Sequence, residues 1–138
     1  MWQTYALLSA FFAALTALFA KIGVKDVNSN LATAVRTLVI LFITWGIVFA
    51  TVEMRDIRSI PRWSLFFIVI SGICTGASWL FHFKALQIGD ASKVAPVDKL
   101  SVVFTMLLAF VILGEPVSGK VLLGGALIAA GSIVMLMS

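Results

Sequence analysis

The segment "ASKVAPVDKLSVVFTMLLAFVILGE", residues 91–115, decides the fold, because it joins a long apolar run to a pair of charges. Residues 100–113 are almost wholly apolar, whereas Asp98 and Lys99 stand side by side directly before them. A helix over residues 94–113 has about the length needed to cross roughly 30 Å of hydrocarbon. The segment therefore predicts a membrane-spanning helix whose first part needs polar surroundings.

The composition of the whole chain favours a membrane protein. Of its 138 residues, 62% are hydrophobic and only 12% are charged, against about 45–50% and about 25% in ordinary soluble domains. A chain of this composition has more apolar surface than its own core can bury, so the excess must face lipid. We therefore expect an integral membrane protein.

Five apolar stretches have the length of membrane-spanning helices, namely residues 2–20, 31–52, 63–83, 94–113 and 121–137. The alternating pattern of membrane β-strands is absent, and backbone groups in lipid must be satisfied within a helix or a closed barrel. The connections are too short to hold a soluble domain. The sequence thus predicts an all-α integral membrane protein, with residues 1–138 forming one five-helix transmembrane domain.

Several kinds of site are not expected. Cys74 and His82 are single residues of their type, which argues against a thiolate or histidine metal site, and no catalytic or phosphate-binding motif occurs. The net charge of +4 comes from Lys and Arg near the helix ends, which argues against nucleic-acid binding. We expect no cofactor, no metal, no catalytic residue and no enzymatic activity.

Polar side chains recur on one face of four predicted helices, with the spacing that an α-helix requires. A single Ser or Thr in a membrane helix often only bonds its own backbone or holds two helices together. Four aligned stripes together favour a polar path through the protein. The candidate wall residues of this path are Tyr5, Ser9, Thr16, Thr33, Thr37, Trp79, Ser101 and Thr105.

Ionisable residues inside the spans are costlier, at about 2.5–3.5 kcal/mol each at mid-depth. Four of them fall near one membrane face as candidate gate or coupling charges: Arg36, His82, Asp98 and Lys99. Asp98 and Lys99 are about 100° apart on a helix and do not face each other, so Arg36 is the expected partner of Asp98. The sequence leaves open whether that pair is a static brace or a working gate. A bend at Pro96 is expected to let the helix start move.

The last predicted span differs from the others in its small residues. Its face contains Gly124, Gly125, Ala126 and Ala129. Small side chains let helix backbones approach closely in a membrane, although they often serve packing within one chain. We expect these four residues to form much of the contact between two copies of the chain.

Residues 83–115, "FKALQIGDASKVAPVDKLSVVFTMLLAFVILGE", resemble the signature end of the EamA domain, the repeat unit of the drug/metabolite transporter superfamily. Residues 124–136, "GGALIAAGSIVML", resemble the last helix of that domain. The resemblance covers the whole chain, with a generic part before residue 83, and is of the short, single-domain bacterial and archaeal type. It implies half of a ten-helix fold and a carrier for small metabolites or toxic compounds, with the site between two repeats.

One departure from relatives bears on the transported solute. Related four-helix multidrug carriers use a glutamate of the first helix to bind proton and cationic drug in turn, but residues 2–20 contain no acid. Export of lipophilic cations by that route is therefore not expected. The excess of positive charge inside the spans favours an anionic or zwitterionic solute.

The number of spans and the loop charges bear on assembly. A tandem copy of a five-helix unit would enter the membrane inverted, and inverted repeats are common in carriers. The loop cations are Arg55, Arg58, Arg62 and Lys120 on one face, and Lys21, Lys25, Lys84 and Lys93 on the other. This balance gives no decided orientation by positive-inside counting.

We therefore expect a dual-topology, antiparallel homodimer in a bacterial or archaeal plasma membrane, carrying a small solute by alternating access. The alternative is a non-transporting membrane subunit, or one that pairs with a second half-sized protein.

Overall fold

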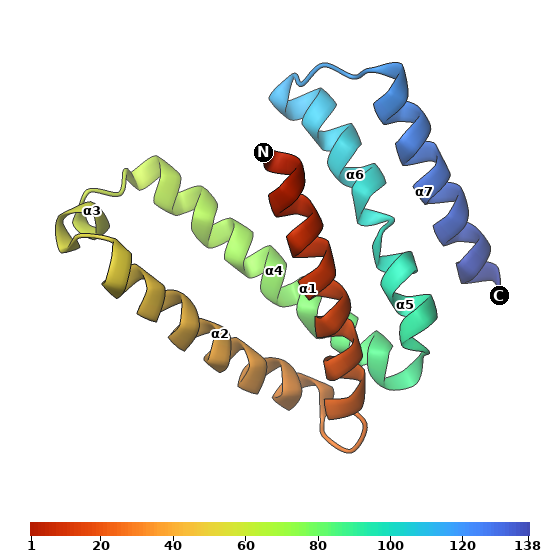
Figure 1. Ribbon diagram of the computed structural model, residues 1–138, viewed down its shortest axis with the longest axis horizontal. Coiled ribbons are helices and arrows are strands. Elements are labelled where there is room, and N and C mark those ends of the chain that lie inside the picture. Colours follow the sequence, from red (N-terminus) through yellow and green to blue (C-terminus); the bar gives the residue numbers. More distant parts are fainter. The chain divides into compact units, whose positions relative to one another are not determined.

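The computed structural model describes all residues from Met1 to Ser138 and consists of helices joined by short connections (Figure 1). Its elements are α1 (Trp2–Gly23), α2 (Ser29–Thr51), α3 (Met54–Arg58), α4 (Arg62–Ile88), α5 (Ala91–Asp98), α6 (Ser101–Leu108), the π-helical turn η1 (Ala109–Leu113) and α7 (Gly119–Met137). Five helical segments are long and apolar enough to cross a membrane: α1, α2, α4, the stretch Ala91–Leu113 that comprises α5, α6 and η1, and α7. The prediction of an all-α protein with five membrane-spanning helices is confirmed.

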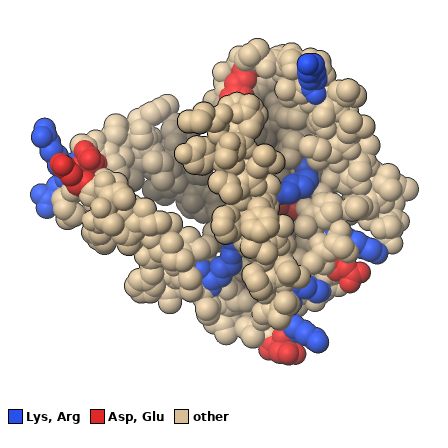
Figure 2. Space-filling model, viewed as in Figure 1, with Lys and Arg blue, Asp and Glu red and all other residues tan.

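The outer surface of the helices is apolar, as a lipid environment requires. Among the large hydrophobic residues only Val24, Phe83 and Leu86 are fully buried, while more than half of the side-chain surface of Phe11, Phe42 and many others is exposed. On the face in Figure 2, most charged side chains gather over α3 and the connections between spans, and the remaining surface is largely uncharged. Helices with apolar exteriors and charged ends belong in a bilayer.

The chain divides into two compact units, and α1 and α4 contribute to both. Unit 1 comprises Met1–Phe19 and Ile88–Ser138, and unit 2 comprises Ala20–Gln87. Unit 1 thus holds most of α1 together with α5, α6, η1 and α7, whereas unit 2 holds the end of α1 with α2, α3 and α4.

Unit 2 is tied together where α1 and α4 end. The last carbonyls of a helix have no partner inside it, and side chains from the other helix supply donors here. Lys21 Nζ donates to the Leu86 carbonyl at 2.6 Å. Gln87 Nε2 donates to the carbonyls of Val24 at 3.1 Å and Val27 at 2.7 Å. These bonds explain why α4 continues to Ile88, five residues beyond the apolar stretch that the sequence marks.

Local signals set the other helix boundaries. The Asn28 side chain accepts hydrogen bonds from the Asn30 and Leu31 amides at 2.9 and 3.4 Å, so α2 begins at Ser29. At the other end of the chain, Gly114 follows η1 with a φ of 65°, a left-handed conformation that favours glycine.

The fourth membrane-spanning segment of the chain, which belongs to unit 1, is interrupted. Figure 1 shows the non-helical turn between α5 and α6. Helix α5 ends at Asp98, and α6 begins at Ser101. Across the break the Lys99 amide donates to the Pro96 carbonyl at 3.0 Å, so a three-residue bond replaces the usual four-residue one. The expected bend near Pro96 is therefore an interruption of the helix three residues further on.

Candidate functional site

The break in the fourth span places polar groups well inside a membrane helix. Lys99 is the ninth residue of the stretch Ala91–Leu113, about 12 Å along it. Asp98 and Lys99, at the end of α5, are both exposed, and Ser101 opens α6. The predicted gate charges Asp98 and Lys99 and the wall residue Ser101 therefore lie together at one interruption.

A hydroxyl from α7 adds a second hydrogen bond to the backbone beside the interruption. Ser132 Oγ donates to the Pro96 carbonyl at 2.7 Å, and Ser132 is only 3% exposed. Irregular backbone is tolerated at membrane depth where neighbouring groups or a wet cavity satisfy it. Sequence reasoning assigned Ser132 no role, although its position as the one polar residue within an otherwise apolar last span was the available signal.

Unit 2 contains a cation covered by aromatic rings. Arg36 of α2 is half-buried, and its guanidinium carbon Cζ lies 4.2 Å from the centre of the Trp79 ring and 5.1 Å from that of Phe83, both on α4. Such cation–π contacts are worth about 0.5–2 kcal/mol, depending on how dry the site is. The structure thus brings together two residues predicted separately, the gate charge Arg36 and the wall residue Trp79.

The predicted pairing of Arg36 with Asp98 joins residues of different units, so it stays a prediction. His82 is half-buried on α4, and its ring centre lies 6.3 Å from that of Phe83. Of the four predicted gate charges, Arg36 and His82 therefore belong to unit 2, and Asp98 and Lys99 belong to unit 1.

The predicted threonines bond their own helices. Thr16, Thr33, Thr37 and Thr105 each donate to the carbonyl four residues earlier, at 2.7–2.9 Å. A hydroxyl that donates in this way keeps lone pairs that can accept a hydrogen bond, so these residues can offer acceptors to a solute. Tyr5 and Ser9 are exposed on α1.

The small-residue face of α7 lies against α6 within the chain. A Cβ atom at Gly125 would lie 2.5 Å from Met106 Sδ and 2.7 Å from Met106 Cε, so the missing side chain lets the helices approach. A Cβ at Gly124 would meet nothing within 4 Å. The predicted contact between two copies stays a prediction, but Gly125 already has a packing role inside one chain.

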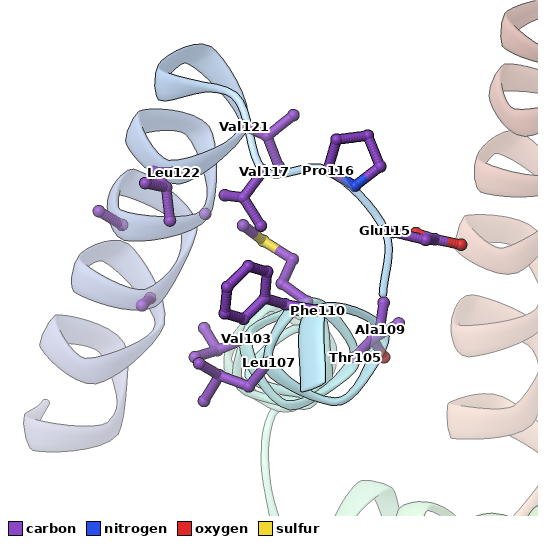
Figure 3. A pocket seen from close by; sticks show the side chains of 14 residues that line it. Val103, Thr105, Leu107, Ala109, Phe110, Glu115, Pro116, Val117, Val121 and Leu122 are labelled. Carbon is purple, nitrogen blue, oxygen red and sulfur yellow. The ribbon is translucent and has the colours of Figure 1, made fainter. Parts of the chain in front are cut away.

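Next to this contact lies an apolar groove of about 690 Å³ between α6, η1 and α7. Gly125, Ala126 and Ala129 line its α7 side. Figure 3 shows Phe110 and Val117 facing this space, whereas the Glu115 carboxylate points away from it. The groove is thus mostly apolar, with Thr105 as a polar residue in its lining.

Comparison with known proteins decides the family. The EamA-like transporter family matches residues 1–137. The chain belongs to this family. It is also 49% identical, over 134 residues, to a Sinorhizobium protein described as an uncharacterized transporter in the cobO 3′ region, and the match covers 97% of this chain and 95% of the relative. No solved structure showed significant similarity.

Membership in the EamA-like transporter family confirms the resemblance carried by residues 83–115 and 124–136. Together with the five membrane-length helices, it makes the protein an integral membrane transporter. The family assignment points to transport and not to enzymatic chemistry.

Proposed function

We propose that this EamA-family protein is a secondary carrier that moves a small metabolite or toxic compound across a bacterial or archaeal plasma membrane by alternating access. The observation that carries this proposal is the broken fourth span, with Asp98, Lys99 and Ser101 at the interruption. Discontinuous helices near the bilayer midplane are a recurrent feature of carrier sites. A static helical anchor has no need of a broken span.

The proposed carrier works as an antiparallel homodimer. Its five spans supply one EamA unit, and carriers of this kind commonly place the solute between two inverted units. The balance of four cations on each set of loops supports insertion in both orientations. Gly124, Gly125, Ala126 and Ala129 of α7 are the proposed contact between protomers, which requires α7 to pack on its partner beside α6.

The proposed solute path is lined by residues of α1, α2, α4 and α6. The wall residues are Tyr5, Ser9, Thr16, Thr33, Thr37, Trp79, Ser101 and Thr105, and the gate or coupling charges are Arg36, His82, Asp98 and Lys99. The break before Ser101 supplies a point at which α5 and α6 can change their relative angle.

Two measurements test this proposal. Reporter fusions at Ser138 are expected to score on both sides of the membrane, and two or three extra lysines in one set of loops should bias them to one side. Strictly one-sided reporters in the unmodified chain would exclude the antiparallel homodimer.

The second measurement is solute flux into liposomes that contain only the purified protein, after a thermal-shift screen has found a stabilising solute. Flux by this protein alone supports the carrier. A protein that moves no solute until a second half-sized protein is added is a heteromeric subunit instead.

A further inference from the structure

We propose that Arg36 binds an anionic group of the solute, a carboxylate or a phosphate, while Trp79 and Phe83 hold its guanidinium in position. This inference rests on the proposed carrier function and names its substrate class. Arg36 is the contact residue, and the two aromatic residues are positioning residues.

The geometry leaves the hydrogen-bonding edge of Arg36 available. Both of its contacts are with ring systems, at 4.2 Å for Trp79 and 5.1 Å for Phe83. A guanidinium has five N–H donors and no acceptor, and a contact with a ring face leaves the positive charge in place and occupies none of the donors. Within unit 2, the hydrogen bonds that hold side chains together involve other residues, chiefly Lys21 and Gln87.

The helices around Arg36 contain no acid that could serve as its counter-ion. The acids of unit 2 are Asp26, Glu53 and Asp56, and each lies outside the spans Ser29–Thr51 and Arg62–Ile88. Arg36 itself lies seven residues into α2, about 10 Å along the helix from Ser29. A cation at this depth attracts an anion strongly, because the surrounding dielectric constant is low.

The donors on the neighbouring turns of α2 are already used. Thr33 Oγ1 donates to the Ser29 carbonyl, and Thr37 Oγ1 donates to the Thr33 carbonyl. Of the polar side chains on this face, Arg36 is thus the one with N–H groups to give. Its planar fork matches the two oxygens of a carboxylate or phosphate, which a lysine would hold only as a point charge.

Rigid positioning strengthens such a site. Phe83 is 2% exposed and Trp79 is half-buried, so packing restricts the rotation of both rings. Holding a long arginine side chain against them reduces the freedom that it would lose on binding a solute. A positively charged solute is disfavoured at the same place, because neither α2 nor α4 supplies an acid to offset the guanidinium.

Binding is tested with Trp79 as the reporter. A variant that retains only this tryptophan (Trp2→Phe, Trp45→Phe and Trp63→Phe) is purified in an uncharged detergent. Benzoate, succinate and glycerol 3-phosphate are titrated against their uncharged counterparts benzamide, succinamide and glycerol. We expect at least one anion to change the Trp79 emission saturably, with an affinity at least tenfold above that of its counterpart.

Two substitutions at Arg36 and one matched control decide the role of the guanidinium. Arg36→Gln should abolish the anion-dependent change, and Arg36→Lys, which keeps the charge and is the safer variant for folding, should weaken it about tenfold through loss of the fork. Lys84→Gln removes one exposed cation from the same helix as Trp79 and should leave the affinity within twofold. Equal binding of the uncharged counterparts, no saturable change with any of the anions, or unchanged binding in Arg36→Gln overturns the inference.

Phospholipid headgroups carry the same phosphate chemistry, so the titration is repeated in nanodiscs of phosphatidylcholine with and without phosphatidylglycerol. Soluble anions that bind in both nanodiscs support a solute site. If phosphatidylglycerol alone changes Trp79 emission and no soluble anion competes, the ligand is a lipid and the solute site is excluded.

Failure of the site and failure of the carrier give different results. Arg36-dependent anion binding without flux in liposomes would contradict the proposed carrier function and support the proposed binding site. If an uncharged solute is transported and its flux is unchanged in Arg36→Gln, the proposed anion site is contradicted and the proposed carrier function is supported.

Discussion

Two regions of the molecule keep polar groups inside a membrane in opposite ways. In unit 1, the Pro96 carbonyl beside the interruption accepts hydrogen bonds from the Lys99 amide at 3.0 Å and from Ser132 Oγ at 2.7 Å. In unit 2, the charge of Arg36 is covered by ring faces, which leave its donors unused. The carbonyl in unit 1 therefore has its hydrogen-bond partners within the chain, whereas the guanidinium in unit 2 can still donate hydrogen bonds to a ligand.

This difference separates a structural polar contact from one suited to binding. A satisfied carbonyl gains little from a solute, because its hydrogen bond is already made. An arginine held by rings gains two charge-assisted hydrogen bonds when an anion arrives. The unit 1 contact should therefore affect stability, and the unit 2 contact should affect both stability and binding.

The largest expected effect is at Trp79. Trp79→Ala removes the ring that covers Arg36 and its packing between α2 and α4, and should lower the free energy of unfolding by about 3 kcal/mol. Trp79→Phe keeps an aromatic face and should cost about 1 kcal/mol. Unfolding of the purified protein in detergent measures both. Equal losses in the two variants would mean that the cation–π contact contributes nothing.

In unit 1, larger side chains at Gly125 test the packing between α6 and α7. Gly125→Leu forces a side chain into Met106 and should destabilise the chain by about 1–3 kcal/mol. Gly125→Ala should cost less, because the Met106 atoms in its way are at the flexible end of that side chain. Gly124→Ala, where nothing lies within 4 Å, is the matched control.

A double-mutant cycle tests whether the side chain introduced at Gly125 is strained against Met106. Met106→Ala should recover part of the stability lost in Gly125→Leu, with a coupling of at least 0.5 kcal/mol. Additive losses would place the strain elsewhere. Cross-linking of the same variants separates packing inside one chain from contact between protomers.

Removal of the Ser132 hydroxyl should have a smaller effect. Ser132→Ala leaves the Pro96 carbonyl with only its backbone partner and should cost about 0.6–2 kcal/mol. Ser71→Ala, at an exposed position of α4, should change stability by less than about 0.5 kcal/mol. A Ser132→Ala variant as stable as the parent protein would mean that the hydroxyl does not support the break.

The smallest stability effect is expected at Thr37. Its hydroxyl returns to its own helix at Thr33, so Thr37→Val should change the free energy of unfolding by less than about 0.5 kcal/mol. Thr37 is also a proposed wall residue, so solute flux should fall even though the fold is intact. Unchanged flux in this variant removes Thr37 from the proposed path.

Hydropathy predicted the spans because each is a long, local signal in the sequence. The break after Asp98 was harder to predict, because Pro96 marks a bend, while the group that adds a hydrogen bond to the Pro96 carbonyl comes from another helix. That group, Ser132, lies 36 residues away in sequence. A local pattern could show that Ser132 is polar but could not name its partner.

In the candidate site too, the residues could be predicted from the sequence but their contacts could not. Arg36 and Trp79 were both singled out from their residue types and depths in the spans, but in separate roles. Their contact depends on the rotation of α2 and α4 about their axes, which packing sets and periodicity does not. The low-dielectric depth of Arg36 could be predicted, whereas the rings that cover it could not.

The bonds from Gln87 to the Val24 and Val27 carbonyls have a consequence for biogenesis. Gln87 is synthesised 60 residues after Val27, about 3–12 s later at ordinary translation rates. α1 is already made when that interval begins and α2 is completed within it, but the turn between them lacks the donor that completes it. We expect the nascent hairpin to be held by water or by the insertion machinery until α4 arrives, so a chain stalled before Gln87 presents an unfinished turn to cellular proteases.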